Sequence, residues 1–209
     1  MKWRVLIINS NKQYDNMFIN QNWEVMKDAL TIPNLIQFTG GSDVDPHFYK
    51  QKKHSSTTSV FGRDRAEQLI FKWGLSENIP MAGICRGGQF LNVMCGGNLW
   101  QDVNEHSTGF SHKAQDIKSK EVFDVTSTHH QMMIPTKRGQ LVITSNICTR
   151  REKFLPSGKL LKLTNKTGND VEAVYYEQYN VFCFQPHPEF SSKKELSGRY
   201  FSYLDDFLL

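Results

Sequence analysis

The sequence predicts an α/β protein with an open, mostly parallel, twisted sheet covered by helices on both faces. In the first half of the chain, short apolar runs of strand length alternate with stretches whose apolar residues recur at helical spacing. Strands separated by helices pair in parallel, because a crossover connection joins them. A chain of 209 residues with 39% hydrophobic residues is long enough to bury one sizeable core. We therefore expect residues 1–209 to form a single domain.

The composition argues against several other classes of protein. No apolar run approaches the ~20 residues that cross a bilayer, and residues 5–8 are too short for the apolar part of a signal peptide, so we expect a cytoplasmic protein. Four cysteines do not make a disulfide framework, and none has zinc-site spacing. The net charge of +4 is scattered, without the basic stripe interleaved with aromatic residues that marks a nucleic-acid interface.

The first part of the chain carries two predicted strands and a turn that faces a ligand. Residues 3–9 are predicted as a strand, residues 15–30 as a helix and residues 35–38 as a second strand. Gly40 and Gly41 follow this second strand, at the point where an open α/β sheet directs backbone donors toward a ligand.

A polar stretch separates this turn from the next helix. Residues 50–60 are expected to form a mobile surface loop, which is either a lid over an active site or a plain excursion. A helix is then expected from Arg63 to about Gly74.

The centre of the sequence pattern is a cysteine between a strand and a helix. Residues 79–84 form a short apolar run that ends at Cys85, and residues 88–95 have helical spacing. Gly83 and Gly87 flank Cys85 in the G-x-nucleophile-x-G pattern of a nucleophile elbow, whose turn is so tight that a Cβ at either glycine would collide with backbone. We expect the sulfur to lie at a helix N-terminus, where free N–H groups favour the thiolate.

The second half of the chain is predicted to add a small antiparallel extension and a closing helix. A loop that bears His106 and His112 leads into this half. Strand-like runs are expected at residues 121–127, 141–147, 160–163, 171–176 and 181–185, the last two paired across a turn, followed by a helix at 193–208.

A histidine and a carboxylate follow the last predicted strand. His187 stands between Pro186 and Pro188, which fix the backbone on both sides of it, and Glu189 comes two residues later. A cysteine, a histidine that takes its proton and a carboxylate that orients the histidine together form a catalytic triad. We expect Cys85, His187 and Glu189 to be these three residues.

Together these motifs resemble the class I glutamine amidotransferase domain. Within it they are most similar to the γ-glutamyl hydrolase (peptidase C26-type) branch typified by γ-glutamyl-γ-aminobutyrate hydrolase, in a compact form similar to small phage and bacterial proteins. The segments that carry the resemblance are residues 40–46, Arg63-Asp64 with Glu67, and residues 83–89, 96–102, 127–131 and 185–189. The resemblance implies a flavodoxin-like α/β fold and a hydrolase without a cofactor.

The resemblance also implies how the reaction runs. Cys85 would attack the γ-carbonyl of a glutamyl group and form a thioester, while the backbone N–H groups of Gly41 and Arg86 form the oxyanion hole. His187 would protonate the departing amine and then activate the water that releases glutamate.

The resemblance places the amino-acid end of the glutamyl group against Gln89 and the backbone around His129 and His130. We expect no metal site, because two adjacent histidines point apart on a strand. Asp43 and Asp45 are expected to stabilise their own turn.

Two other functions stay open at this stage. The same catalytic residues would serve a glutaminase subunit that passes ammonia to a separate synthase or amidoligase, and the fold could also serve a non-catalytic binding protein. In each case we expect a small-molecule partner, a γ-glutamyl substrate or glutamine, and neither nucleic acid nor membrane. The sequence leaves the identity of the leaving amine open.

Overall fold

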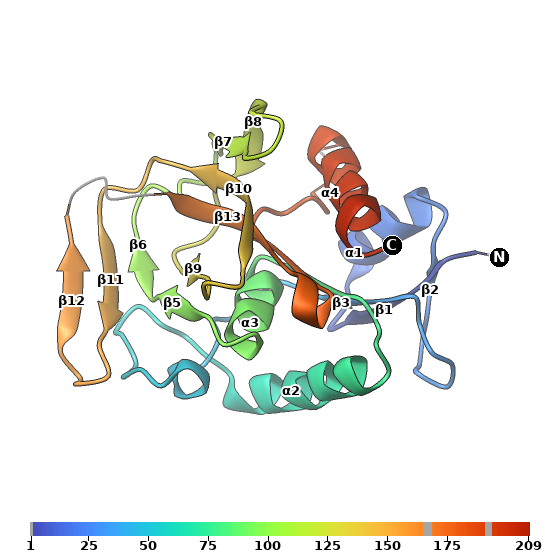
Figure 1. Cartoon of the computed structure of the whole chain (residues 1–209), viewed down its shortest axis with the longest axis horizontal. Coiled ribbons are helices and arrows are strands. Elements are labelled where there is room, and N and C mark those ends of the chain that lie inside the picture. The colour runs from blue at the N-terminus through green and yellow to red at the C-terminus, as the bar shows by residue number, and fades with distance from the viewer. Residues whose placement is uncertain (1, 165–168, 191–193) are drawn as a thin grey trace.

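The computed structural model describes residues 2–164, 169–190 and 194–209. Within them, the central element is a nine-stranded sheet with the order β2-β1-β3-β4-β14-β13-β10-β7-β8 (Figure 1). Five neighbouring strands run parallel: β2 Glu24–Val25, β1 Arg4–Ile8, β3 Leu35–Phe38, β4 Met81–Ile84 and β14 Val181–Phe184. The others pair antiparallel: β13 Asp170–Tyr176, β10 Gln140–Ser145, β7 Ser111–Asp116 and β8 Val122–Thr126. The predicted α/β class is confirmed, and its antiparallel part is larger than expected.

Helices cover both faces of this sheet (Figure 1). The helices are α1 Lys12–Asn20 and α4 Lys194–Phe207 on one face, and α2 Phe61–Ser76 and α3 Arg86–Met94 on the other. On β3, Leu35 joins the core under α1 and α4, and its neighbour Ile36 joins the core under α2 and α3. Successive strand side chains point to opposite faces, so a strand covered on both sides is mostly apolar, with Gln37 as the polar residue of β3. None of the helices in the described residues is both long and apolar enough to cross a membrane.

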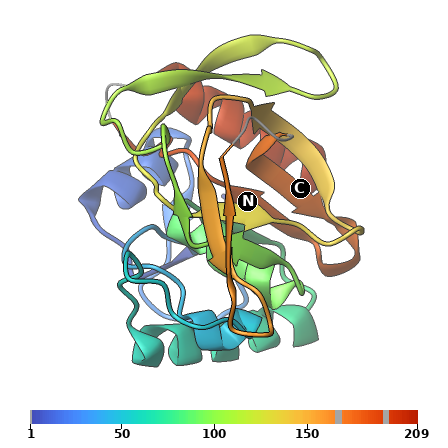
Figure 2. The same ribbon diagram turned by 90° about the vertical axis from the view of Figure 1, so that its left-hand side faces the viewer.

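Two smaller sheets lie beside the main sheet. They consist of β6 Asp102–Val103, β11 Arg151–Phe154 and β12 Leu160–Leu163 in one, and of β5 Asn98–Trp100 and β9 Met132–Ile134 in the other. The β11–β12 hairpin faces the viewer in Figure 2. Both β5 and β9 contact α3, so this sheet supports the helix that follows the predicted elbow. Two short 3-10 helices complete the fold, η1 Pro46–Tyr49 and η2 Glu177–Tyr179.

The predicted helix over residues 15–30 is wrong in its boundaries. The helix α1 starts earlier, because the side chain of Asn11 accepts hydrogen bonds from the first free N–H groups and caps it. It ends ten residues early, where Asn22 has a positive φ of 63° and the chain turns into β2. Leu30, counted as an apolar helix position, is exposed. The apolar spacing of residues 23–30 therefore did not reflect a helix face.

Most other predicted elements are confirmed near their expected positions. The strands predicted at 121–127, 141–147 and 160–163 correspond to β8, β10 and β12, and β13 pairs with β14 in the antiparallel hairpin that was expected. The predicted helix at 193–208 corresponds to α4, although residue 193 lies outside the described residues. The predicted His-bearing loop is only partly a loop, because His112 lies on β7. The strand β11 was not expected.

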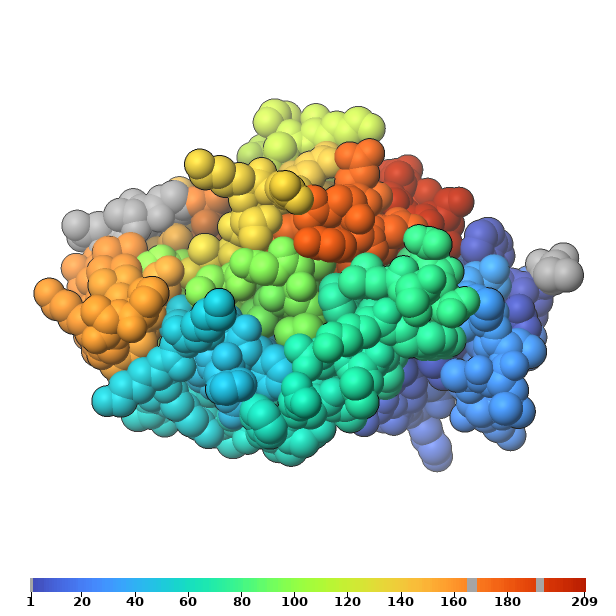
Figure 3. Space-filling model, turned by 60° about the horizontal axis from the view of Figure 1, so that its bottom comes forward, coloured from blue at the N-terminus to red at the C-terminus, as the bar shows by residue number. Residues whose placement is uncertain are grey.

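The polar loop at residues 50–60, which was expected to be mobile, is held to the rest of the fold by hydrogen bonds. The side chain of Gln101 donates to Gln51 Oε1 and to the carbonyl of Lys52, and its oxygen accepts from the amide of His54 and the hydroxyl of Thr57, at 2.7–3.0 Å. The segment from η1 through α2 covers much of the face turned to the viewer in Figure 3, between the β11–β12 hairpin and the N-terminal strands. One glutamine side chain thus holds most of this loop in place.

Candidate active site

The strand β4 ends at Cys85, which caps the N-terminus of α3. Cys85 has φ 52° and ψ −115°, a conformation that non-glycine residues rarely adopt. A Cβ on Gly83 would lie 2.4 Å from the backbone of Gly87, so the turn requires glycine there. The strained strand-to-helix turn expected of a nucleophile elbow is therefore present at Cys85.

His187 and Glu189 lie at the same edge of the sheet as Cys85. His187 follows β14, which pairs in parallel with β4, so both strands deliver their next residues to one place. The Nδ1 atom of His187 lies 2.5 Å from Oε1 of Glu189. A Cβ built on Gly40 would lie 3.0 Å from Cε1 of His187 and 3.7 Å from Cβ of Cys85. The structure thus brings together the three residues predicted as a triad.

The charges around His187 favour its protonated form. Burial lowers the pKa of the imidazole, but the charge of Cys85 and hydrogen bonding with Cys85 and Glu189 outweigh burial and raise the pKa of His187 to about 10. The ring also stacks on Phe190, with 4.7 Å between centroids. A held imidazolium beside a thiol is the arrangement that activates cysteine nucleophiles.

Tyr14 on α1 reaches the same place, and sequence reasoning missed it. Its hydroxyl accepts a hydrogen bond of 2.9 Å from the amide of Gly40. Burial raises the pKa of Tyr14 strongly, and the charge of Glu189 raises it further. The sequence offered only an aromatic residue on an amphipathic helix, which is the usual pattern of a core residue.

A cavity of about 330 Å³ opens beside Cys85. Its lining is mostly polar and comes from the Gly-Gly turn, the anchored loop, the elbow and the segment between β8 and β9: Gly41, Ser42, Asp43, Ser56, Thr58, Cys85, Arg86, Gln89, Thr128, His129, His130 and Gln131. All five residues predicted for the oxyanion hole or for substrate binding are among them. A polar cavity that meets a candidate nucleophile is the expected form of an enzyme site.

Gly41 and Arg86 line this cavity together with Cys85. Gly41 has φ 134°, a conformation that disfavours any side chain. The N–H of Arg86 is the first of α3, and the first N–H groups of a helix have no acceptor inside the helix. Both backbone amides therefore belong to segments suited to present a donor at the cavity.

Gln89 lies one helical turn after Cys85 and is buried. Its Nε2 donates to the carbonyl of Gln131 and to Oε1 of Gln185, each at 3.1 Å. These contacts hold the side chain at the cavity wall in a fixed orientation.

His129 and His130 contact different groups, but they do not lie on the expected strand. They belong to the irregular segment between β8 and β9. The Nδ1–H of His129 donates to the carbonyl of Gln131 at 2.8 Å, and the ring is buried with its Nε2 3.8 Å from Oε2 of Glu172. His130 lies 3.1 Å from Oδ1 of Asp43, and hydrogen bonding to Asp43 raises its pKa.

Asp43 and Asp45 stabilise the segment in which they lie. Asp45 accepts a hydrogen bond from the amide of His47, two residues on, as expected of a turn aspartate. Asp43 accepts from the amide of Thr58 and so joins the turn to the anchored loop.

A buried ion-pair network lies beneath the elbow, and its geometry was not foreseen. The guanidinium of Arg86 pairs with the carboxylates of Asp64 and Glu67 on α2, and all three side chains are almost fully buried. Arg63 pairs with Glu67 at 2.8 Å and donates to the carbonyls of Thr39 and Gly40 at 3.1 and 3.0 Å. Burial raises the pKa of Asp64, while the charge of Arg86 opposes that shift. The network therefore ties α2 to the elbow and to the Gly-Gly turn.

Residues 16–189 match the family model described as Peptidase C26. The chain belongs to this family. Over 188 residues it is 30% identical to the glutamine amidotransferase-like protein YvdE of Lactococcus lactis, covering 79% of this chain and 70% of that protein. It is also 30% identical over 131 residues to the carbamoyl phosphate synthase small chain of Thermotoga maritima, covering 56% of this chain and 33% of that one.

Solved structures agree on the fold of this Peptidase C26 member. A crystal structure of a glutamine amidotransferase from Thermotoga maritima superimposes with a TM-score of 0.63 at 16% identity, covering 99% of this chain and 85% of that one. The relatives confirm the resemblance to a class I glutamine amidotransferase-like domain, and they support an enzyme of the glutamine amidotransferase or C–N hydrolase class.

Proposed function

We propose that this chain is a cysteine-dependent hydrolase that cleaves a γ-glutamyl amide bond through a γ-glutamyl thioester, releasing glutamate and an amine. The observation that carries the proposal is the convergence of Cys85, His187 and Glu189 at one sheet edge, beside a polar cavity. The buried Glu189 carboxylate beside His187 fits a histidine that holds and returns a proton. Membership of the Peptidase C26 family supports the same chemistry.

In the first half of the reaction, the sulfur of Cys85 attacks the γ-carbonyl carbon. A C–S bond forms and the carbonyl oxygen becomes an oxyanion, which the N–H groups of Gly41 and Arg86 would stabilise by a few kcal/mol, about 3 to 4 for one such donor. The C–N bond then breaks, and His187 gives its proton to the departing amine.

In the second half, water attacks the thioester carbon. His187 accepts a proton from that water, a C–O bond forms and the C–S bond breaks. Glutamate leaves and the sulfur of Cys85 returns to its starting state. Glu189 holds the orientation of the imidazole throughout, at 2.5 Å.

The polar groups around the cavity suit the amino-acid end of a glutamyl substrate. Asp43 supplies a carboxylate for the α-ammonium group, and His130 beside it is partly exposed. Gln89 and the backbone of residues 129–131 complete the same wall. The α-ammonium and α-carboxylate groups of a glutamyl substrate would therefore both find polar partners on this wall.

The alternative function is a glutaminase subunit that supplies ammonia to a separate synthase or amidoligase. The relative named as the small chain of carbamoyl phosphate synthase favours this reading, because its name describes one chain of a larger enzyme. Both functions use the same triad, so the triad does not separate them.

Two measurements separate and test these functions. The purified chain is assayed against glutamine and a panel of γ-glutamyl amines, and intact-protein mass spectrometry looks for a glutamyl adduct in wild type and in a Cys85→Ala control. We expect turnover of γ-glutamyl amines by the chain alone and an adduct that requires Cys85. Activity on glutamine only, and only with an added synthase, would favour the glutaminase. Absence of both turnover and adduct with every substrate, with and without an added synthase, would refute both enzymes.

A further inference from the structure

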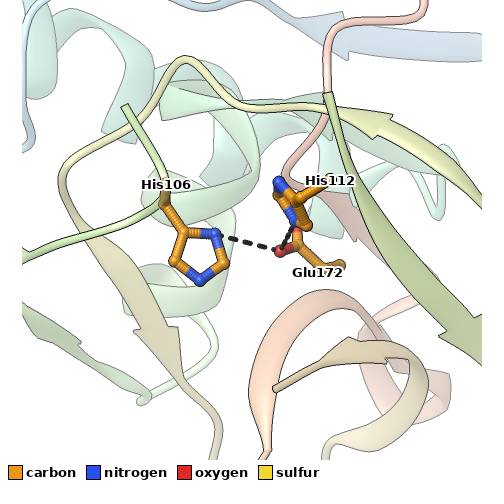
Figure 4. Close-up of side chains that lie close together, drawn as sticks. All are labelled: His106, His112 and Glu172. Atoms are coloured by element: carbon orange, nitrogen blue, oxygen red, sulfur yellow. Dashed lines mark hydrogen bonds and ion pairs between the residues drawn. The ribbon is translucent and has the colours of Figure 1, made fainter. Parts of the chain in front are cut away.

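A second cluster of chemically active side chains lies outside the active site. His106, which precedes β7, and His112 on β7 both face Glu172 on β13 (Figure 4). Nε2 of His112 lies 2.9 Å and Nδ1 of His106 lies 3.3 Å from the same oxygen, Oε1 of Glu172. The three atoms lie within 4.8 Å of one another. The side chains of His106 and Glu172 are completely buried, and that of His112 is 7% exposed.

The spacings of the two histidine nitrogens from Glu172 suit a tetrahedral zinc site. Zinc binds imidazole nitrogen and carboxylate oxygen at about 2.0–2.2 Å, so two ligand atoms of a tetrahedral site are about 3.3 Å apart. The two measured separations from Glu172 lie close to that value. Two imidazoles and one carboxylate suit Zn²⁺ rather than Mg²⁺ or Ca²⁺, which prefer oxygen ligands throughout.

The contacts behind His106 are those that a metal-binding histidine requires. Its second ring nitrogen, Nε2, lies 3.2 Å from Oδ2 of Asp170, which leaves Nδ1 for the Glu172 side. Asp170 is itself held by the amide of Cys148 at 2.9 Å and by the guanidinium of Arg151. A carboxylate behind the imidazole fixes its tautomer and its direction in known metal sites.

A fourth donor is available from His129. Its Nδ1–H donates to the carbonyl of Gln131, so Nε2 carries a lone pair. This Nε2 lies 3.8 Å from Oε2 of Glu172, and among the described residues neither atom has a hydrogen-bond partner. Two buried acceptors that face each other without a donor are costly, and a cation between them removes that cost.

The Glu172 carboxylate at the centre of the cluster requires a positive partner. Within the described residues, the side chains at ion-pair distance from the buried Glu172 carboxylate are all histidines: His106, His112 and His129. A buried carboxylate requires a positive charge nearby. That charge is supplied either by a proton on a histidine or by a metal ion.

We propose that His106, His112 and Glu172 bind one Zn²⁺ ion, with Nε2 of His129 as the fourth ligand. This proposal replaces the expectation that the chain has no metal site. The reason for that expectation, that adjacent histidines do not chelate together, still holds, because His130 points to Asp43 instead. The carbonyl of Gln131 accepts hydrogen bonds from both His129 and Gln89, so the ion would also stiffen the cavity wall.

The test uses metal titrations of the full-length protein after removal of metal by a chelator. Co²⁺ is the probe, because tetrahedral Co²⁺ gives intense visible absorption bands, and Zn²⁺ is then added to displace it. The titration is run on wild type, Cys85→Ala, His112→Gln and Glu172→Gln, with His47→Gln as the control for an exposed histidine. The Cys85→Ala variant removes the thiol of the Cys85–His187 pair, which is a second place where zinc could bind. Circular dichroism establishes which variants are folded.

We expect one tetrahedral Co²⁺ per chain, displaced by Zn²⁺, in wild type, Cys85→Ala and His47→Gln. Loss of an outer partner costs ~10–100-fold in affinity, so loss of a direct ligand in His112→Gln or Glu172→Gln should cost more than ~100-fold. The proposal is overturned if wild type binds no stoichiometric metal, if binding disappears in Cys85→Ala, or if it persists unchanged in folded His112→Gln. Wild type and Cys85→Ala alone decide the matter if both ligand variants fail to fold.

Discussion

Gly87 in α3 packs directly against the backbone of Phe38 at the end of β3. A Cβ at Gly87 would lie 2.5 Å from the carbonyl oxygen of Phe38 and 2.6 Å from its carbonyl carbon, so no side chain fits at Gly87. This contact sets how closely the elbow helix approaches the sheet, and therefore where Cys85 is held.

Gly87→Ala should destabilise the protein and displace the elbow. The added methyl group cannot avoid the Phe38 carbonyl without a backbone shift, and such overpacking costs about 1–3 kcal/mol or more. Gly62→Ala is the matched control, because a Cβ on Gly62 in α2 would have no neighbour within 4 Å. Alanine is the better helix former there and should raise stability by about 0.5–1 kcal/mol. Urea denaturation of both variants measures these changes, and equal effects would contradict the argument.

Arg86→Met should cost about 3–5 kcal/mol of stability. The change leaves the carboxylates of Asp64 and Glu67 buried without their main cation, which is the unfavourable half of a broken ion pair. Arg65→Met on the exposed side of α2 serves as the control and should change stability by less than about 1 kcal/mol. Thermal and denaturant unfolding of both variants test this. A cost for Arg86→Met no larger than that of the control would show that the network carries no stability.

Glu189→Gln should lower kcat/KM by about 10²–10⁴ and shift the pH profile to the acid side. The amide keeps the shape of the side chain but removes the charge that, with Cys85, keeps the pKa of His187 near 10. The alkaline limb of the profile should therefore move to lower pH in the variant. A variant with reduced rate and an unmoved alkaline limb would mean that Glu189 does not act on His187.

The raised pKa of His187 also makes stability depend on pH. The folded protein keeps this proton to about pH 10, whereas an unfolded histidine loses it near its ordinary value of 6.5. The contribution of His187 to stability is therefore fully present below about pH 6.5 and is lost as the pH rises to about 10. His187→Gln should flatten the fall of stability across this window, measured by denaturant unfolding at pH 6, 8 and 10. An identical fall in both proteins would exclude the linkage.

Tyr14→Phe should lower stability by about 1–3 kcal/mol, because the partly buried amide of Gly40 loses its acceptor. It should also lower kcat more than it raises KM, because Gly40 lies beside both Cys85 and His187 and the phenol lies next to Glu189. Tyr175→Phe, a partly buried tyrosine on β13 that packs on Phe207, removes a phenol away from the site and should leave the kinetics unchanged. Loss of stability without any kinetic change would limit Tyr14 to a structural role.

The elements that were predicted correctly are those marked by several independent features close together in the sequence. The elbow at Cys85 is marked by an apolar strand, two glycines and a helix within about fifteen residues, and His187 is fixed by two prolines. The helix α1 was misplaced because the apolar spacing continued past Asn22, where the chain takes a positive φ and turns back to pair with β1. A single sequence shows the helical spacing of apolar residues, but it does not show that the same residues gain more by pairing with a distant strand.

The contacts that sequence reasoning missed join residues far apart in the chain. Tyr14 meets Gly40, and Glu172 meets His106 and His112, across separations of 26 to 66 residues. The strand β7 was missed because its alternation is polar on the exposed side, with only Ala114 and Asp116 buried. No local spacing rule reports which buried carboxylate a distant histidine will face.

The four hydrogen bonds of the Gln101 side chain have a consequence for selectivity. They hold the loop that contributes Ser56 and Thr58 to the cavity before any substrate arrives. Binding then incurs little entropy loss for ordering this wall, and a leaving group is accepted or rejected by its fit to a surface that is already shaped. New amine preferences should therefore follow from replacing side chains on the loop, with Gln101 left intact.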